Sequence, residues 1–421
     1  MQRNDLASRK APSGNGDVLF KAAVASAVFL FFLLSGYAVS ASPPHDVFGS
    51  LLGRDFVSMW IGGHAAATGD TFYLYDFTRL QEVLHRLFGP LAMQSWGYPP
   101  PMLFLVWPFG ALPYFPGLVL WSAAGLALYL AVARQEDRSY RNLLFLIVAP
   151  AVALNLVTGQ NGFFTAVLII LALRHLDSRP VVAGIFLGLL TIKPQLGILF
   201  PVALMVSGRW RCFLSAAATA LVLALASLLV FGAGVWRDFF ELGMAMQANI
   251  LTHGKGILVT MMPTAFMNAR LLGAPPWLAW LAQMPFSVLA VGAVIWTFAK
   301  RRDPVLSIAV LVTAGFVVTP YVYGYDMVVF GWLIAMLRPR LTTTAGRSLA
   351  LTVWALPLLT ILLGLLHLPL SGPVLALFLL WLLRQLQADA SVLPIEPRSC
   401  IASSSRAATP TSPARSHLRG S

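Results

Sequence analysis

Long apolar runs alternate with short polar clusters along the chain between Val18 and Arg384. About 20 apolar residues are enough for a helix to cross a hydrocarbon core of about 30 Å, and the runs between clusters reach that length. No long polar stretch between them could fold as a separate soluble domain. The pattern predicts one membrane domain over residues 18–386 and a cytoplasmic tail at 1–17. Residues 387–421 are rich in Ser, Ala, Pro and Arg, so we expect them to form a disordered, cytoplasmic tail.

The composition supports an all-α, polytopic membrane protein with about 10–13 transmembrane helices. Hydrophobic residues make up 58% of the 421 residues and charged residues only 11%, whereas soluble chains carry about 25% charged residues. The formal net charge is +13. The basic residues lie in short clusters between apolar runs, which is the pattern that sets membrane topology. We therefore expect the lipid bilayer as a partner, and no nucleic acid.

The basic clusters predict which loops are cytoplasmic. The first apolar run, residues 18–41, follows three basic residues, and we favour a retained helix over a cleaved signal peptide because the run exceeds the usual h-region of 7–15 residues. One region stays open. Prolines divide residues 98–133 into two helices, so either one piece is re-entrant or the cluster at 134–141 lies outside.

Polar residues interrupt the apolar runs at three hairpin tips on the outer side. These tips are Gly159-Gln160-Asn161-Gly162, Lys193-Pro194-Gln195, and the segment 319–326. The half-helices around the first two tips are only about 13–17 residues long, so the tips can lie within the membrane depth, where irregular backbone must be buried or line a wet cavity. We expect a cavity open to the outside.

Two longer segments are expected on the same outer side. Residues 42–97 combine many acidic and aromatic residues, and the spacing of Phe56, Met59, Trp60 and Gly63 predicts an amphipathic helix lying at the membrane interface. In residues 232–276 the apolar piece is too short to span, and we expect this segment to cap the cavity.

Several strings of the sequence occur together in a known order: "RDFVSMWIGGHAAATGD", "YPPPMLFLVWPFGALP", "GQNGFF", "GLLTIKPQLGILFP" and "TPYVYGYDMVVF". In this order they resemble glycosyltransferase family 87, long catalogued as a domain of unknown function. The resemblance implies a C-type glycosyltransferase fold, which takes a sugar from a polyprenyl-phosphate donor at the outer face of the membrane. Mycobacterial mannosyltransferases of phosphatidylinositol mannoside synthesis are well-known relatives, so a hexose, foremost mannose, is the expected sugar. The family's essential first-loop aspartate corresponds to Asp55, and its lysine–proline step to Lys193-Pro194.

Asp55 is the candidate general base. A carboxylate within about 3 Å of the attacking hydroxyl can take its proton, and the adjacent Arg54 would keep Asp55 ionised. Alternatively, Asp55 only caps the helix that begins at Phe56, since aspartate is a favoured N-cap.

Lys193 is the candidate for binding the donor phosphate. It is the only charged residue between Arg179 and Arg209, and a charge inside an apolar run costs roughly 2.5–3.5 kcal/mol, which makes it a functional candidate. The alternative is a lysine that snorkels to the interface. Further outer-side cations that could bind phosphate are Arg54, His64, His253 and Lys255, although a lone histidine is more often structural.

Polar side chains at the tips are candidates for binding sugar or acceptor: Tyr98, Gln160, Asn161, Gln195, Tyr325 and Asp326. Each has a structural alternative. The amides can belong to a simple turn, Tyr98 can be a packing residue, and the tyrosines near Asp326 can form an interfacial aromatic belt. Neither the histidines, the carboxylates nor the two cysteines, Cys212 and Cys400, have metal-ligand spacing, so we expect no metal and no cofactor.

These observations predict a hexosyltransferase in the inner membrane, with its active site facing the periplasm and a lipid or glycan as acceptor. A transporter or flippase of envelope lipids or sugars is the main alternative, because transporters also place helix breaks near the midplane. A noncatalytic partner in envelope assembly is the third.

Overall fold

The computed structural model describes the backbone of residues 13–300 and 302–392, and the side chains of 18–300 and 302–389. The predicted tails, 1–17 and 387–421, lie mostly outside the described residues, as does Cys400. Within the described part the secondary structure is helical, and β-pairing is limited to two isolated bridges. The helices α1 (Ser13–Ser40) and α20 (Ser371–Val392) extend a few residues into the predicted tails.

Six helices in the described part are long and apolar enough to cross a membrane. They are α1, α5 (Tyr114–Ala133), α11 (Trp210–Phe231), α16 (Pro276–Phe298), α19 (Thr344–Leu365) and α20. A seventh span is obtained if α6 (Tyr140–Ile147) and α7 (Pro150–Thr158), which meet at 50°, are taken together. The all-α, polytopic membrane fold is confirmed. The predicted count of about 10–13 spans is reached only if shorter apolar helices also cross the membrane.

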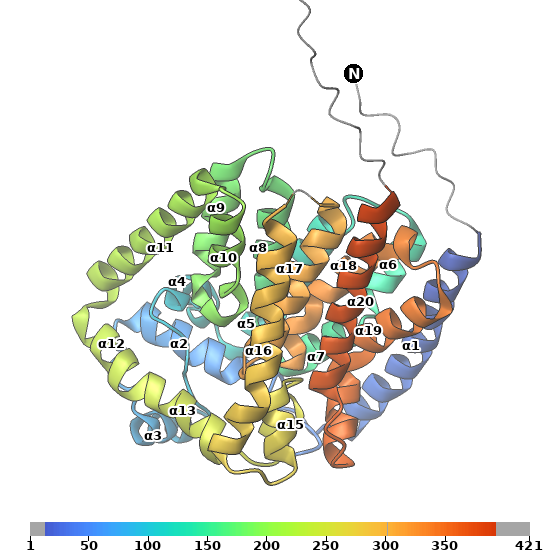
Figure 1. Cartoon of the computed structure of the whole chain (residues 1–421). Coiled ribbons are helices and arrows are strands. Elements are labelled where there is room, and N and C mark those ends of the chain that lie inside the picture. The colour runs from blue at the N-terminus through green and yellow to red at the C-terminus, as the bar shows by residue number, and fades with distance from the viewer. Residues whose placement is uncertain (1–12, 301, 393–421) are drawn as a thin grey trace, which may run out of the picture.

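The shorter apolar helices lie beside the long ones. They are α8 (Gly162–His175), α9 (Pro180–Leu189), α10 (Phe200–Val206), α17 (Pro304–Val318) and α18 (Val328–Leu337). At 1.5 Å per residue most of them are shorter than the hydrocarbon core. Figure 1 shows α9 and α10 in the upper part of the molecule, above α2 and α4. The turn between α9 and α10 is buried at Leu190, Ile192 and Lys193.

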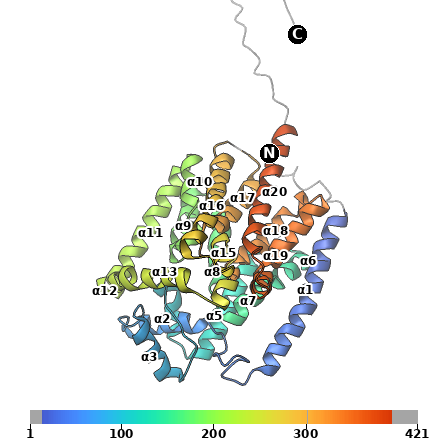
Figure 2. The same ribbon diagram turned by 60° about the horizontal axis from the view of Figure 1, so that its bottom comes forward.

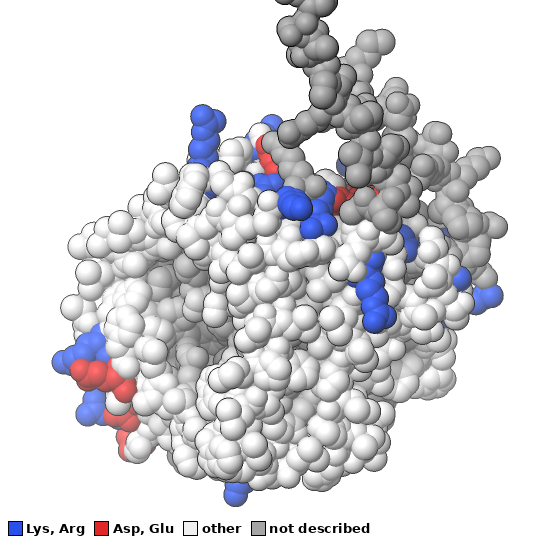
Figure 3. Space-filling view, viewed as in Figure 1, with Lys and Arg blue, Asp and Glu red and all other residues white. Residues whose placement is uncertain are grey.

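The basic loops gather at one end, here called the basic end, which contains residues 134–141, 174–179, Arg209 and Arg338. Ion pairs join these loops to one another: Arg174 pairs with Glu136, Arg209 with Asp177 at 2.8 Å, and Arg338 with Asp137 at 3.1 Å. Figure 1 shows α1 beginning and α20 ending at this end, and in Figure 3 most Lys and Arg of the visible face gather there.

The ion pair between Arg174 and Glu136 bears on the question left open at residues 98–133. Because the loop 134–141 belongs to the basic end, α5 reaches that end from the opposite one. The preceding α4 (Met102–Gly110) has 9 residues, a length of about 14 Å, which is about half of a hydrocarbon core of about 30 Å. This geometry favours α4 as the re-entrant piece, and the side of the membrane on which the loop 134–141 lies stays a prediction.

The predicted helix at Phe56 is α2 (Phe56–Thr68), but it is not an interfacial helix. It lies under other elements at the end opposite the basic end (Figure 2), and residues are buried around most of its circumference. Its sequence has no charged face to turn toward water, and its small residues let α4 approach closely. A Cβ placed on Gly63 would lie 2.2 Å from the carbonyl oxygen of Val106.

The remaining outer segments also form helices. The amphipathic helix in residues 42–97 is α3 (Phe77–Phe88), which buries Leu80 and Leu84. Residues 232–276 form α12 (Ala233–Asp238), the π-helix η3 (Phe239–Gly243), α13 (Met244–His253), α14 (Ile257–Thr260) and α15 (Ala265–Leu271). Gln247 of α13 donates a hydrogen bond to the carbonyl of Gly97. The segment thus packs against the loop that carries Tyr98.

Candidate functional site

The turn between α7 and α8 brings the three predicted tips together. Gly159 ends α7 with a left-handed φ of 65°, a conformation that favours glycine. A Cβ on Gly162 would lie 2.2 Å from the carbonyl oxygen of Tyr325. The side chain of Asn155 fixes this contact, because it donates to the Tyr325 carbonyl at 2.7 Å and accepts from the Gly162 amide at 2.9 Å. The first tip is therefore in backbone contact with the third.

Asp55 lies at the start of α2 but does not cap it. Its backbone is helical, and its carboxylate makes no capping hydrogen bond. Instead, Oδ2 of Asp55 accepts a hydrogen bond from Nε2 of Gln160 at 3.0 Å, and Oε1 of Gln160 accepts one from the hydroxyl of Tyr98 at 3.3 Å. The amide of Gln160 thus orients the carboxylate, and Tyr98 orients the amide.

The surroundings of Asp55 change its affinity for protons. Burial raises the pKa of its carboxyl above the ordinary aspartate value, while the Gln160 hydrogen bond and the charges of Arg54 and Lys193 act in the opposite direction. An ionised carboxylate with a raised pKa accepts a proton from a hydroxyl more readily than an ordinary aspartate does.

Lys193 lies where Pro194 separates the 3-10 helices η1 (Leu190–Ile192) and η2 (Pro194–Gly197). Only 3% of its side chain is exposed, so it does not snorkel to a surface. Its Nζ donates to Oδ1 of Asp326 at 2.6 Å and to Oδ1 of Asn161 at 3.1 Å. These two contacts connect the second tip to the first and the third.

Asp326 is the fixed counter-charge of Lys193. Its side chain is fully buried, and its Oδ2 accepts a hydrogen bond from the backbone amide of Tyr323 at 3.2 Å. The ring of Tyr325 lies 4.8 Å from Nζ of Lys193 and stacks on Tyr323 at 4.8 Å between centroids. Both tyrosines are buried, so they do not form an interfacial aromatic belt.

These contacts define one cluster, here called the Asp55–Lys193 cluster: Asp55, Tyr98, Gln160, Asn161, Lys193, Tyr325 and Asp326. Of these residues only Asp55 and Tyr98 are partly exposed. The rings of Tyr98 and Tyr325 lie against the ammonium of Lys193. Aromatic rings thus pack closely around the ammonium of Lys193, and the cavity open to the outside stays a prediction.

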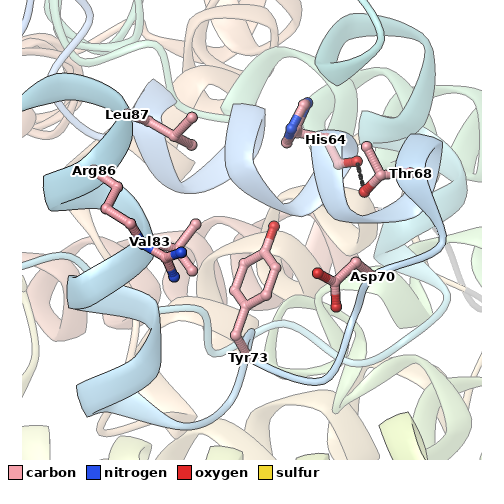
Figure 4. Close-up of a pocket in the computed structure, with 7 residues that line it drawn as sticks. All are labelled: His64, Thr68, Asp70, Tyr73, Val83, Arg86 and Leu87. Carbon is pink, nitrogen blue, oxygen red and sulfur yellow. Dashed lines mark hydrogen bonds between the residues drawn. The ribbon is translucent and has the colours of Figure 1, made fainter.

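In the described part of the chain, the other predicted site residues make no hydrogen bond or ion pair with this cluster, although Arg54 directly precedes Asp55. Arg54 forms an ion pair with Asp46 at 3.4 Å. His64 stacks on Trp60 at 4.8 Å and lines a pocket next to α3 (Figure 4). His253 and Lys255 are exposed near the end of α13. In the part of the chain that the structure describes, Gln195 likewise makes no hydrogen bond or ion pair with the cluster. The roles of all five residues stay predictions.

Sequence reasoning missed two residues that build the site. Asn155 is a buried amide in an otherwise apolar helix, and a lone polar residue in such a run is a signal that could have been used. Trp121 donates from Nε1 to the carbonyl of Gly159 at 3.0 Å. Among the described residues no group of three His, Cys, Asp or Glu side chains could hold a metal ion, and a metal-independent reaction stays a prediction.

Comparison with known proteins gives one family and two relatives. The model of glycosyltransferase family 87 matches residues 96–320, more than half of the chain. Two alpha-(1->3)-arabinofuranosyltransferases, from two strains of Mycobacterium tuberculosis, are each 26% identical to the chain over 264 residues. The matched region covers 58% of this chain and 59% of each relative, which is less than two thirds of their length. No solved structure matches the chain.

Proposed function

The chain belongs to glycosyltransferase family 87, and from that premise we propose that it transfers a sugar from a polyprenyl-phosphate donor to a hydroxyl of a lipid or glycan acceptor, with Asp55 as general base. The observation that carries this proposal is the hydrogen bond between Gln160 and Asp55 at 3.0 Å. It places the carboxylate of Asp55, a partly exposed residue, in the same cluster as a buried lysine. Asp55 lies outside the residues matched to the family, so its role depends on this geometry.

The proposed step is a direct displacement at the anomeric carbon. Asp55 takes the proton of the acceptor hydroxyl as its oxygen bonds to the anomeric carbon. The bond from that carbon to the phosphate oxygen breaks, and the polyprenyl phosphate leaves with the electron pair. One base and one displacement invert the anomeric configuration. The amide of Gln160 holds the carboxylate in place, so little reorientation is needed during the reaction.

Lys193 is proposed to stabilise the phosphate as it leaves. An ammonium has three N–H donors, and two of them are used by Asp326 and Asn161. The third has no hydrogen-bond acceptor in the described part of the chain, and in the proposed complex a phosphate oxygen takes that place. Asp326 holds the lysine side chain in place through the ion pair, which prepares the site before the negative charge develops.

The sugar is proposed to lie between Asp55 and Lys193. The amides of Gln160 and Asn161 and the hydroxyl of Tyr98 can bind sugar hydroxyls, and the ring of Tyr325 offers an aromatic face. Gln195 stays a candidate for the acceptor, because no contact joins it to the cluster.

The proposed orientation places the basic end in the cytoplasm and Asp55 on the periplasmic side of the inner membrane. Lys and Arg favour cytoplasmic loops, and the ion pairs of Arg174, Arg209 and Arg338 support a common side for these loops. The proposed membrane domain, residues 18–386, then has its outer segments 42–97 and 232–276 around the site.

Two donor sugars are candidates. The sequence resemblance favours a hexose such as mannose, whereas the printed names of the two relatives favour arabinofuranose. The test uses the purified chain in lipid nanodiscs with polyprenyl-phosphate mannose, glucose and arabinofuranose, each labelled in the sugar. We expect transfer of one of these sugars to a membrane-extract acceptor. Absence of transfer from every donor, together with movement of labelled lipid across the bilayer in proteoliposomes, would favour a flippase.

A further inference from the structure

A pocket with a cavity volume of about 270 Å³ lies between α2 and α3, apart from the Asp55–Lys193 cluster. Figure 4 shows the polar residues His64, Asp70, Tyr73 and Arg86 around it, with the apolar Val83 and Leu87 on the α3 side. We call this the α2–α3 pocket. Its volume is somewhat below the range of pockets that hold drug-sized ligands, so it suits a single ring better than a lipid or an extended glycan.

The polar groups of this pocket are available to a ligand. In the described part of the chain, Asp70 and Arg86 have no hydrogen bond and no ion pair, although both line the same pocket. The hydroxyl of Tyr73 has no hydrogen-bond partner among the described residues, and Figure 4 shows it directed toward the centre of the pocket. Burial raises the pKa of Tyr73 to about 12, so its hydroxyl stays protonated and can donate.

Two rings of the pocket have fixed positions. The ring of His64 stacks on Trp60 with centroids 4.8 Å apart and an angle of 10°. Tyr73 is only 4% exposed. Asp70 and Arg86 are exposed, so a ligand would order these two side chains, at a cost in conformational entropy.

The charges of the pocket select the class of ligand. The Asp70 carboxylate accepts hydrogen bonds and repels anions, whereas the Arg86 guanidinium donates hydrogen bonds and repels cations. A neutral polyol satisfies both groups, because each hydroxyl can donate to Asp70 and accept from Arg86. The C–H face of a sugar ring can pack against Val83 and Leu87. A phosphate would instead face an uncompensated Asp70.

The pocket shares α2 with the proposed base. Asp55 immediately precedes α2, and His64 lies in its third turn, about 14 Å further along the helix axis. We propose that the α2–α3 pocket is a subsite for one neutral sugar unit of a glycan acceptor, remote from the hydroxyl that reacts. This inference rests on the proposed function, since it assigns the acceptor to a glycan, and it gives the acceptor at least one sugar beyond the reacting one.

The first test is binding of methyl glycosides, without any transfer. Methyl mannoside and methyl arabinofuranoside are titrated onto the purified chain in nanodiscs by saturation-transfer NMR. We expect saturable binding of at least one of them, weakened about 10-fold by Asp70→Asn, by Arg86→Gln and by Tyr73→Phe. The matched control is Glu82→Gln, an exposed charge on α3 outside the pocket, which should bind as the native chain does. Absence of binding, equal binding by all variants, or binding of inorganic phosphate in place of the glycosides would overturn the assignment.

The second test is kinetic. With a glycan acceptor, Asp70→Asn and Arg86→Gln should raise the acceptor KM about 10-fold at unchanged kcat, because the lost contact binds ground state and transition state equally. A fall in kcat at unchanged KM would contradict a remote subsite. Asp55→Asn separates the two proposals. It should lower turnover roughly 10²–10⁴-fold and leave glycoside binding intact. If Asp55→Asn transferred sugar normally, the assignment of Asp55 as the base would be wrong. Glycoside binding would still test whether the α2–α3 pocket is a sugar subsite.

Discussion

The substitution Lys193→Met tests whether Lys193 has a role beyond its ion pair. Methionine is an unbranched side chain of similar length that lacks both the charge and the N–H donors of lysine. In the structure, Nζ of Lys193 lies 2.6 Å from Oδ1 of Asp326, and both side chains are buried. Removing one partner of a buried pair leaves an uncompensated charge and costs about 3–5 kcal/mol. We expect Lys193→Met to lower thermal stability in detergent clearly, and to lower turnover by about 10²-fold or more, because a donor to the leaving phosphate is lost.

The double substitution Lys193→Met with Asp326→Asn separates stability from catalysis. It removes both charges, so thermal stability should return close to the native value, while turnover should stay low. Stability is measured as the fraction of monodisperse protein after heating, and turnover with labelled donor at saturating acceptor. Recovery of turnover together with stability in the double variant would refute the phosphate role and leave Lys193 as a structural residue. Lys193→Arg, which keeps the charge with a different shape, should retain part of the turnover.

Three further predictions concern the base, the turn and the topology. Burial raises the pKa of Asp55, and only the ionised carboxylate accepts a proton. The value of kcat/KM should therefore fall as the pH drops through a pKa above the ordinary aspartate value. Gln160→Leu removes a hydrogen bond that lowers this pKa, so it should shift the acid limb of the pH profile to higher pH. Gly162→Ala should reduce the yield of folded protein, because the added Cβ would lie 2.2 Å from a backbone carbonyl oxygen; native yield would contradict the close contact. The topology is tested with single cysteines in a background without the native cysteines. In cells with a permeable outer membrane, Ala92→Cys should react with an impermeant thiol reagent, whereas Arg138→Cys should react only after the inner membrane is broken. The reverse pattern would invert the proposed topology.

The sequence predicted the all-α polytopic fold and the helix breaks at the tips, because these depend on local composition. The length of an apolar run sets whether a helix can span, and the breaks at Gly159 and Pro194 are local backbone effects. The helix at Phe56 was also predicted correctly, but its position was not. An interfacial helix needs a strongly polar face, and α2 has none, so its burial against α4 could have been inferred from the same residues.

The convergence of the tips was beyond the sequence reasoning, since it depends on contacts between distant residues. The hydrogen bond from Asn155 to Tyr325 and the ion pair of Lys193 with Asp326 both join separate hairpins. The ion pair of Lys193 with Asp326 could have been predicted from the sequence. Asp326 is the only acidic residue in the apolar stretch between Asp303 and Asp389, and a lone buried lysine requires a counter-charge.

The measurement that tests the central proposal most directly is sugar transfer by Asp55→Asn beside Asp76→Asn. Both substitutions lie in residues 42–97 and are nearly isosteric, but Asp76 caps α3 through a hydrogen bond to the Arg79 amide, a role that asparagine fills equally well. A general base predicts a loss of turnover of roughly 10²–10⁴-fold for Asp55→Asn at unchanged donor binding, with native turnover for Asp76→Asn. Native turnover in Asp55→Asn would contradict the proposal.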